Sequence, residues 1–276
     1  MNGEPHPGLA GVAPQPGTPK PDPILVVEGV RRSFGGLQAV DVDHLEVQRG
    51  VITALIGPNG AGKTTLFNVL TGFDRADAGA WIFDGVPLHG RRAHQIARAG
   101  MVRTFQLTKA LARLTVLDNM LLAAPGQRGE RFSGALAQGW RLQEERNRQQ
   151  AQGLLDRFGL APMSGHFAGM LSGGQRKLLE MARSLMAVPR LLLLDEPMAG
   201  VNPALRRSLL DHIDGIRQEG ATVVFIEHDM DVVMGISDWV VVMAEGRVLA
   251  EGPPAVVGRD RAVIDAYLGH RRGAGA

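Results

Sequence analysis

The chain contains no cysteine, and this absence excludes several kinds of structure. Without thiols it can form neither a disulfide nor a thiolate metal site, and thiols give no indication of its redox compartment. Long apolar runs are also missing: residues 191–194 and 239–244 are among the longest, whereas about 20 residues are needed to span a bilayer. The N-terminus lacks the basic-then-apolar order of a secretion signal. We therefore expect a chain that does not cross a membrane by itself and that faces the cytoplasm.

Charge of either sign is not in large excess. The 30 Lys and Arg residues against 28 Asp and Glu residues give a formal net charge of +2. A balance this close to neutral is weak support for binding nucleic acid, and we expect no nucleic-acid partner. The length of 276 residues corresponds to one or two domains with a sizeable core. No internal repeat is evident, which favours one nucleotide-binding unit over a fused tandem.

Composition changes along the chain indicate its organisation. Residues 1–23 carry seven prolines and almost no large apolar side chains, and they are predicted to form a disordered tail. Short strands predicted at 24–27, 44–47 and 81–83 suggest a small antiparallel layer. Residues 115–158 have a helical pattern, in which the polar run 143–150 is read as a solvated helix face. Apolar strands at 191–194, 222–226 and 239–243 then alternate with helical segments, as in a parallel sheet buried on both faces. A hairpin at 244–246 and an amphipathic segment at 262–268 follow.

A glycine-rich loop lies between the strand predicted at 51–56 and the helix predicted at 65–70. Its sequence is Gly57, Pro58, Asn59, Gly60, Ala61, Gly62, Lys63, Thr64, which fits the pattern GxxxxGK[ST] in the context that this pattern requires. Glycines allow backbone N–H groups to converge on one point, and the following helix directs its positive end there. The loop therefore predicts a phosphate site, with Lys63 on the outer phosphates and Thr64 on a Mg²⁺ ion.

Two carboxylates follow the apolar strand 191–194. Asp195 and Glu196 would lie at the carboxyl end of that strand, which is where ligands of open α/β sheets gather. Asp195 is then placed to hold Mg²⁺ through a water molecule, and Glu196 to accept a proton from the attacking water. A solvated acidic turn is the alternative for these two residues in isolation.

A second glycine-containing helix start occurs at Ser172, Gly173, Gly174 and Gln175. The helix predicted after it keeps apolar positions at helical spacing until Pro189 ends it. By itself this stretch could be an N-cap followed by a loop. Taken with Lys63, Asp195 and Glu196 in this order, however, it resembles the signature sequence of the ATP-binding cassette (ABC) ATPases.

The resemblance extends over nearly the whole chain from Ile24 onward. It implies an ABC ATPase domain at 24–271 of α/β class, with a P-loop NTPase (RecA-like) core at 24–106 and 171–271. A small antiparallel β subdomain and an inserted α-helical subdomain at 107–170 complete the implied fold. Further motif matches imply that Phe34 stacks on adenine, that Gln106 touches Mg²⁺ and the attacking water, and that His228 contacts the γ-phosphate. A lone aromatic or histidine at such positions is otherwise structural.

The resemblance implies the following roles. The residues that bind nucleotide are Phe34, Gly57, Pro58, Asn59, Gly60, Ala61, Gly62, Lys63, Thr64 and Thr65. The catalytic residues are Glu196, His228 and Gln106, and those near Mg²⁺ are Thr64, Gln106 and Asp195. Ser172, Gly173, Gly174 and Gln175 would contact ATP held by a partner chain, because two chains of this family pack head to tail around two ATP molecules.

One loop departs from the commonest family pattern, because Ala199 and Asn202 stand where Ser and Asp are usual. The resemblance implies communication between subunits through this loop, and the departure falls on the residues that would carry it. Other strings look like the ATPase subunits of branched-chain amino-acid importers, among them 103–106, 196–203, 226–230 and 266–269. Carriers for other neutral amino acids, urea or amides belong to the same branch, and lipopolysaccharide-export ATPases are close relatives.

The implied function is ATP hydrolysis that powers an importer for branched-chain or other neutral amino acids. The implied partners are membrane permease subunits, a second ATPase chain that is identical or a paralogue, and indirectly a periplasmic or extracellular solute-binding protein. The chain would lie at the cytoplasmic face of the membrane. One alternative is the ATPase of another ABC system, for urea or amide uptake or for lipopolysaccharide export. A second is a soluble ABC ATPase acting on ribosomes or nucleic acid, and a third is a nucleotide-sensing subunit without turnover. A fourth is an adenylate-type kinase, which leaves the Ser172 segment and His228 unexplained.

Overall fold

The computed structural model describes residues 6–104, 111–125 and 139–273 and divides into two compact units. The first, called the sheet unit, comprises the residues up to Arg103, Arg190–Met198 and the residues from Ile213 onward. The second, called the helical unit, comprises Thr104–Pro189 and Ala199–His212.

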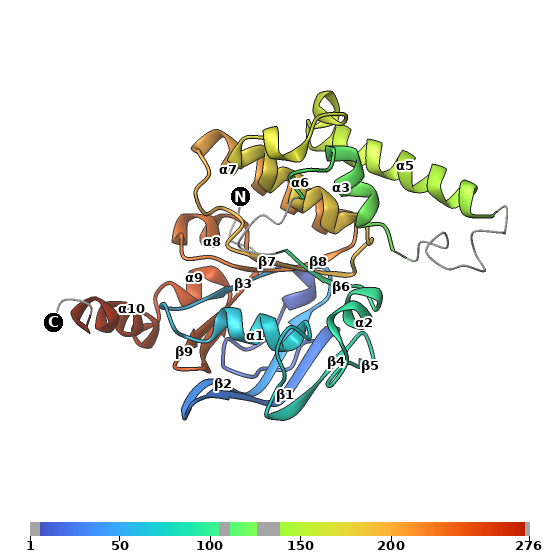
Figure 1. Cartoon of the computed structure of the whole chain (residues 1–276). Helices are drawn as coiled ribbons and strands as arrows, with labels where there is room; N and C mark the ends of the chain where they lie inside the picture. The colour runs from blue at the N-terminus through green and yellow to red at the C-terminus, as the bar shows by residue number, and fades with distance from the viewer. Residues whose placement is uncertain (1–5, 105–110, 126–138, 274–276) are drawn as a thin grey trace. The chain divides into compact units, whose positions relative to one another are not determined.

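The sheet unit contains two β-sheets (Figure 1). The antiparallel sheet has the order β2-β1-β4-β5 and is formed by β1 (Pro23–Phe34), β2 (Leu37–Gln48), β4 (Ala78–Phe83) and β5 (Val86–Pro87). The second sheet has the order β10-β9-β3-β8-β7-β6 and is formed by β3 (Ile52–Ile56), β6 (Met101–Arg103), β7 (Leu191–Asp195), β8 (Thr222–Ile226), β9 (Trp239–Ala244) and β10 (Arg247–Gly252). In it, β10 is antiparallel to β9, and the other pairings are parallel. The predicted α/β class and antiparallel layer are confirmed.

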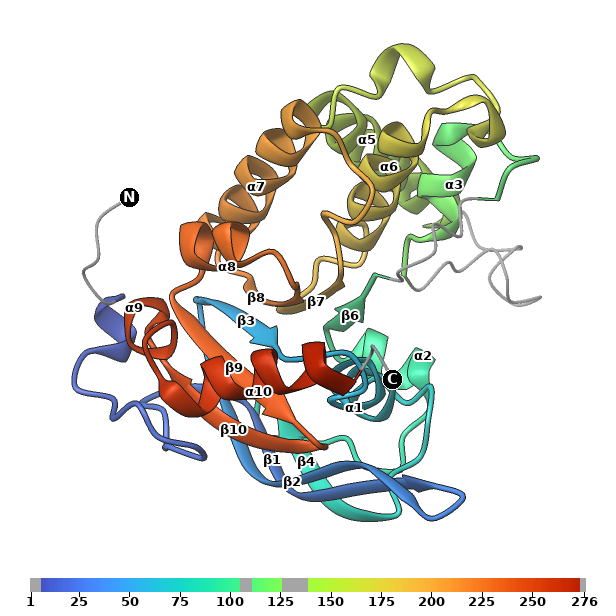
Figure 2. The same cartoon turned by 90° about the vertical axis from the view of Figure 1, so that its left-hand side faces the viewer.

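Helices accompany the sheets and make up most of the helical unit. Those of the sheet unit are α1 (Lys63–Leu70), α2 (Ala93–Arg98), α8 (Met230–Ile236), α9 (Pro254–Val257) and α10 (Arg261–Gly273). Those of the helical unit are α3 (Val116–Leu122), α5 (Gly139–Arg157), α6 (Gly173–Leu185) and the short 3₁₀ helices η3 (Ala161–Met163) and η4 (Ala168–Met170). Helix α7 (Pro203–Gln218) begins in the helical unit and ends in the sheet unit. Figure 2 shows α9 and α10 beside β10.

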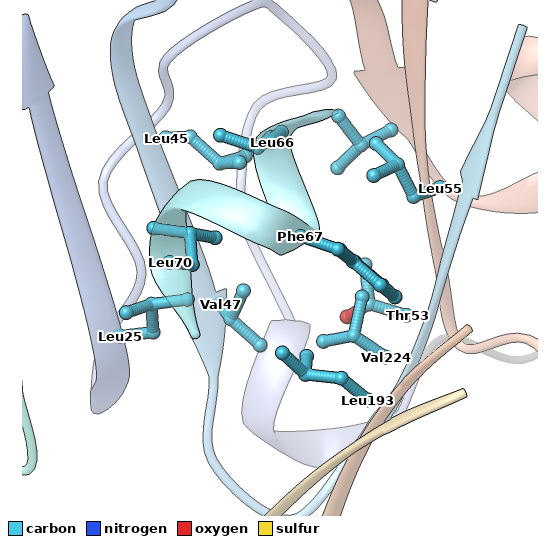
Figure 3. A pocket seen from close by; sticks show the side chains of 11 residues that line it. Leu25, Leu45, Val47, Thr53, Leu55, Leu66, Phe67, Leu70, Leu193 and Val224 are labelled. Carbon is cyan, nitrogen blue, oxygen red and sulfur yellow. The ribbon is translucent and has the colours of Figure 1, made fainter. Parts of the chain in front are cut away.

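The core of the sheet unit lies between α1 and the two sheets. Strands β3, β7 and β8 are buried along their whole length, and their mostly apolar sequences leave no polar face. Figure 3 shows a cavity in this core, where Phe67 of α1 points toward Val224 and Leu193 of the parallel sheet. The cavity measures about 20 Å³ and is lined by apolar side chains and Thr53. This space is of the order of one water molecule, so the nucleotide must bind elsewhere.

Two-residue turns connect β1 to β2, β4 to β5 and β9 to β10. The turn between β9 and β10 consists of Glu245 and Gly246, which have φ angles of 49° and 82°. Two successive positive φ angles are characteristic of the type I′ turn, whose twist matches that of the strands it joins. The predicted hairpin at 244–246 is therefore present, and it brings β10 back along β9.

The N-terminal segment differs from the predicted disordered tail at 1–23. Its residues 6–23 are ordered: they include the 3₁₀ helix η1 (Pro7–Leu9), and Leu9 is buried in the core. The backbone N–H of Thr18 donates to Glu251 Oε1 at 2.9 Å, and Lys20 Nζ pairs with Glu251 Oε2 at 2.9 Å. The prediction failed because it considered apolar side chains alone, whereas buried polar contacts to β10 hold much of this segment.

The domain boundaries also differ from the predicted core at 24–106 and 171–271 and helical subdomain at 107–170. Residues 171–189 and 199–212 belong to the helical unit. The physical reason is packing, because α6 contacts α3 and α5, and Gly174 at its start lies against the Leu205 side chain of α7. The signature segment is therefore part of the helical unit.

Among the helices at the described positions, none has the length and apolarity that crossing a bilayer requires.

Candidate functional site

The phosphate loop follows β3 and requires glycine at two of its positions. Gly57 and Gly62 have φ angles of 146° and 95°, a region that side-chain-bearing residues rarely adopt. A Cβ atom at Gly57 would overlap the backbone carbonyl oxygen of Met243, and one at Gly62 would overlap that of Ala39. The glycines thus let the loop pack directly against neighbouring backbone, and Gly62 forms the N-cap of α1.

The β9–β10 turn holds one side of the phosphate loop, and the other side is exposed. The N–H of Gly246 donates to the carbonyl oxygen of Ala61 at 3.1 Å, so the β9–β10 turn holds the middle of the loop. Pro58 is buried with Ala61, whereas Asn59, Gly60 and Thr64 are exposed. Thr65, one residue into the helix, is half-buried. The exposed side is therefore the side on which backbone N–H groups can bind an anion and on which the Thr64 hydroxyl can reach a cation bound to that anion.

Lys63 folds back over the loop. Its Nζ atom donates to the carbonyl oxygens of Gly57 at 2.8 Å and Pro58 at 2.9 Å. Burial lowers the pKa of the Lys63 ammonium group, and the carboxylates of Glu196 and Asp195 oppose this shift. A cation that is partly desolvated and held by neutral carbonyl groups gains interaction energy when phosphate oxygens replace them.

Asp195 ends β7 in a buried position. One of its carboxylate oxygens accepts a hydrogen bond, and the other has no donor among the described residues. Its Oδ2 accepts a hydrogen bond from Nη2 of Arg103 at 2.6 Å, and the two side chains are 1% and 4% exposed. Oδ1 is enclosed, and no hydrogen-bond partner for it occurs among the described residues. A buried carboxylate oxygen without a donor suits a cation or a water bound to one. This observation fits the Mg²⁺ position predicted from sequence.

Glu196 and His228 follow the carboxyl ends of adjacent strands. Glu196 has a φ angle of 49° and its N–H donates to the carbonyl oxygen of Ile226 at 3.1 Å. Backbone in this region is strained for residues other than glycine and is enriched at functional sites. The His228 side chain, after β8, is 66% exposed. Because β3, β8 and β7 are neighbours, Lys63, Asp195, Glu196 and His228 all follow the same edge of the sheet.

Phe34 ends β1 with 47% of its surface exposed. The guanidinium group of Arg32 lies 4.4 Å from the centre of its ring, and Asp74 and Asp77 each pair with Arg32 at 2.9 Å. One face of the ring is therefore engaged by a cation. The exposure of Phe34 is compatible with the predicted stacking on a base.

The signature residues form the start of α6 in the helical unit. The Ser172 hydroxyl accepts a hydrogen bond from the N–H of Gln175 at 3.2 Å, and the Gln175 side chain accepts one from the N–H of Ser172 at 2.9 Å. This reciprocal capping box fixes the helix start. Gly173 is exposed, and a Cβ at Gly174 would overlap the Leu205 side chain.

The loop that departs from the family pattern has a local explanation at one position. Asn202 Oδ1 accepts a hydrogen bond from the N–H of Leu205 at 2.9 Å, at the start of α7. Asparagine and aspartate are about equally good N-caps, so Asn202 keeps the helix start that aspartate would provide. Nothing in the structure explains Ala199. The predicted glutamine, Gln106, lies outside the described residues.

Three residues near the site, Arg103, Glu227 and Tyr267, occur in motif strings, but the sequence assigns no individual role to any of them. Arg103 pairs with Asp195, and Glu227 accepts a hydrogen bond from the N–H of Met198 at 2.9 Å. Burial raises the pKa of the Tyr267 hydroxyl on α10, an effect that the backbone N–H of Gly57 opposes. Their positions in motif strings were a signal, but only the tertiary contacts indicate what each side chain holds.

Protein-family models match two parts of the chain. One described as ABC transporter matches residues 40–199, and one described as branched-chain amino acid ATP-binding cassette transporter matches residues 247–272. The first contains the phosphate loop, the signature segment and both carboxylates. The second contains β10, α9 and most of α10.

Similar proteins cover nearly the whole chain. A high-affinity branched-chain amino acid transport ATP-binding protein, BraF of Pseudomonas aeruginosa, is 42% identical and covers 90% of this chain and 98% of its own. A probable branched-chain amino acid transport ATP-binding protein, LivG of Archaeoglobus fulgidus, is 40% identical and covers 89% and 95%. A crystal structure of an ATP-binding cassette of an ABC transporter in its ADP conformation is 35% identical with a TM-score of 0.77, covering 90% and 99%.

Proposed function

Because this chain belongs to the ABC transporter family of ATP-binding cassettes, we propose that it is the subunit that hydrolyses ATP to power an importer of branched-chain or other neutral amino acids. The chain is an ABC ATPase, and its domain binds nucleotide. The observation that carries the proposed chemistry is the grouping of a phosphate loop, a buried carboxylate with an available oxygen and a second carboxylate along one sheet edge.

Different residues of the sheet unit are proposed to bind the phosphates, the adenine and Mg²⁺. Backbone N–H groups of the phosphate loop and Lys63 bind the phosphates of ATP, while Phe34 stacks on the adenine. Thr64 and Asp195 would hold Mg²⁺, which would supply charge neutralisation on the phosphates. No group of three or more His, Asp or Glu residues in the described parts of the chain could hold a metal by itself, and Mg²⁺ commonly keeps several waters and binds phosphate oxygens besides one or two protein ligands.

Glu196 is the proposed general base. It accepts a proton from the water that attacks the γ-phosphate, and His228 contacts that phosphate from the neighbouring strand end. The proposed role of Gln106, toward Mg²⁺ and the attacking water, rests on its motif.

A second ATPase chain, identical or a paralogue, is proposed to complete each site. Ser172, Gly173, Gly174 and Gln175 of one chain would contact the γ-phosphate of ATP bound to the other, and two-fold symmetry satisfies both sites at once. Hydrolysis removes a contact shared by both chains, so the pair reopens. Through such differential contacts, closure and opening can bias the states of membrane permease subunits. A solute-binding protein outside the membrane would deliver the solute.

The importer branch is supported by the match of residues 247–272 and by the named relatives. Under this proposal the chain lies at the cytoplasmic face of the membrane, attached through the permease. Affinity purification from gently solubilised membranes tests the branch. Permease subunits of amino-acid-importer type are expected to co-purify. Co-purification of an export or urea-type permease would contradict the proposed solute class but not the proposed ATPase activity.

The hydrolytic role is tested with Glu196→Gln. We expect turnover to fall by about 10²–10⁴-fold, the contribution of a general base, while ATP binding persists and ATP-bound dimers accumulate. Glu219→Gln makes the same chemical change at an exposed position after α7 and is the matched control. Near-normal turnover in Glu196→Gln would remove Glu196 from its role.

A further inference from the structure

The Arg103 side chain, at the end of β6, is 4% exposed and contacts Asp195 and two residues of α1. Its Nη2 donates to Asp195 Oδ2 at 2.6 Å, and its Nη1 donates to Asn68 Oδ1 at 2.5 Å. Its guanidinium carbon lies 5.6 Å from the centre of the Phe67 ring. Asn68 and Phe67 belong to α1, the helix that starts at the phosphate loop. One side chain therefore links the carboxylate at the end of β7 to the helix that carries Lys63 and Thr64.

This arrangement restricts Asp195 to one orientation. A carboxylate can rotate about its last bond, but Arg103 holds Oδ2 with a charge-assisted hydrogen bond. Oδ1 is then left enclosed and without a donor among the described residues. The planar guanidinium group is itself fixed by Asn68, because its donors have a rigid geometry and bridge two acceptors at set positions.

We propose that Arg103 is a positioning residue that holds the Asp195 carboxylate so that Oδ1 faces the Mg²⁺ of bound Mg–ATP. The inference rests on the proposed function, because it concerns the metal that the ATPase site would use. Outer residues that orient a metal-binding group typically contribute 10–100-fold in metal affinity or activity. Arg103 would act in this way through Asp195, without touching the metal.

The charge and the positioning role of Arg103 predict opposite effects of its removal on Mg²⁺ binding. This difference makes the proposal testable. If only its positive charge mattered, removing it would make the electrostatic potential at Asp195 more negative and strengthen cation binding. If it positions the carboxylate, removing it weakens Mg²⁺ binding. The direction of the change in Mg²⁺ requirement therefore distinguishes an effect of charge from an effect of positioning.

The experiment compares Arg103→Met, Arg103→Lys and Asn68→Leu with the unaltered full-length chain. Arg103→Met removes the charge and both hydrogen bonds. Arg103→Lys keeps the charge but cannot bridge Asp195 and Asn68, and Asn68→Leu removes the second anchor alone. Arg190→Met is the matched control, since Arg190 precedes β7 and contacts Asp84 and the carbonyl oxygen of Ala99. Two readouts are the Mg²⁺ concentration for half-maximal hydrolysis and the Mg²⁺-dependent rise in melting temperature with a non-hydrolysable ATP analogue.

We expect the Mg²⁺ concentration at half-maximum to rise about 10–100-fold in Arg103→Met, with smaller rises in Arg103→Lys and Asn68→Leu and none in Arg190→Met. Analogue binding without Mg²⁺ should remain close to that of the unaltered chain, which also reports that the variants are folded. If Arg103→Met does not fold, the other two variants carry the test. An unchanged or lower Mg²⁺ requirement in the folded variants overturns the inference. A chain that binds Mg²⁺ and the analogue without turnover contradicts the ATPase proposal only, and the melting readout still decides the role of Arg103.

Discussion

Glu227 Oε1 accepts a hydrogen bond from the backbone N–H of Met198 at 2.9 Å, in a position where Glu227 is 1% exposed. Its other oxygen, Oε2, accepts from the N–H of His228 at 3.3 Å. The side chain thus joins the segment after Glu196 to the segment that carries His228. Burial raises the pKa of the Glu227 carboxyl, whereas the two backbone N–H groups and His228 oppose the shift.

Substitution of Glu227 should separate hydrogen bonding from charge. Glu227→Ala leaves the buried N–H of Met198 without its acceptor, which costs about 1–3 kcal/mol of unfolding free energy. Glu227→Gln keeps an acceptor oxygen at the same distance and should cost less. Denaturant unfolding of both variants measures the difference, and equal losses would show that the contact to Met198 contributes little.

The buried pair between Lys20 and Glu251 should hold the N-terminal segment. The two side chains are 1% and 0% exposed, and Glu251 Oε2 also accepts from Trp239 Nε1 at 2.8 Å. Lys20→Met leaves the carboxylate without its cation, and we expect a loss of about 3–5 kcal/mol in unfolding free energy. The double variant Lys20→Met, Glu251→Gln removes both charges and should recover part of it. Limited proteolysis measures the order of the segment, and resistance equal to the unaltered chain in Lys20→Met would contradict the anchoring.

Ser172 should have a role beyond capping α6. Ser172→Ala removes the cap, at about 0.5–2 kcal/mol, and it also removes the hydroxyl proposed to contact the partner's ATP. Ser172→Asn preserves a good N-cap while changing that contact. We expect both variants to lose dimer-dependent hydrolysis more than ATP binding, whereas Lys63→Ala loses ATP binding itself. Normal hydrolysis in Ser172→Asn would reduce the role of Ser172 to helix capping.

His212 should make stability depend on pH. Its ring stacks on Phe158, with ring centres 4.1 Å apart, and burial followed by the charge of Arg157 lowers its pKa below the usual 6.5. The unfolded chain therefore takes up the proton first, and the stability contributed by neutral His212 is present above about pH 6.5 and lost as the pH falls below it. Each pH unit in that window costs up to about 1.4 kcal/mol.

The comparison for His212 is His212→Phe, which keeps an aromatic ring against Phe158 and removes the titration. Unfolding free energies of the two chains measured from pH 7.5 down to pH 5 should diverge, with the unaltered chain losing more. Parallel curves for the two chains would assign the acid sensitivity to other groups.

Much of the fold and of the candidate site could be predicted from local sequence patterns. The motifs at 57–64, 172–175 and 195–196 predicted the family, because the chemistry of each depends on residue types at fixed spacing. Continuous apolar runs predicted β3, β7, β8 and β9, since a strand buried on both faces has no polar side. The antiparallel layer and the hairpin at 244–246 were also predicted, from local turn chemistry.

Tertiary structure alone decided the remaining features, because they depend on contacts between residues far apart in the chain. No local pattern relates Lys20 to Glu251, so the order of residues 6–23 was missed. The assignment of α6 to the helical unit follows from packing against α3 and α5. The link from Arg103 to Asp195 and Asn68 spans 92 and 35 positions. Spacing along the sequence can place a carboxylate at a strand end, but only the folded chain determines which of its oxygens is left for a ligand.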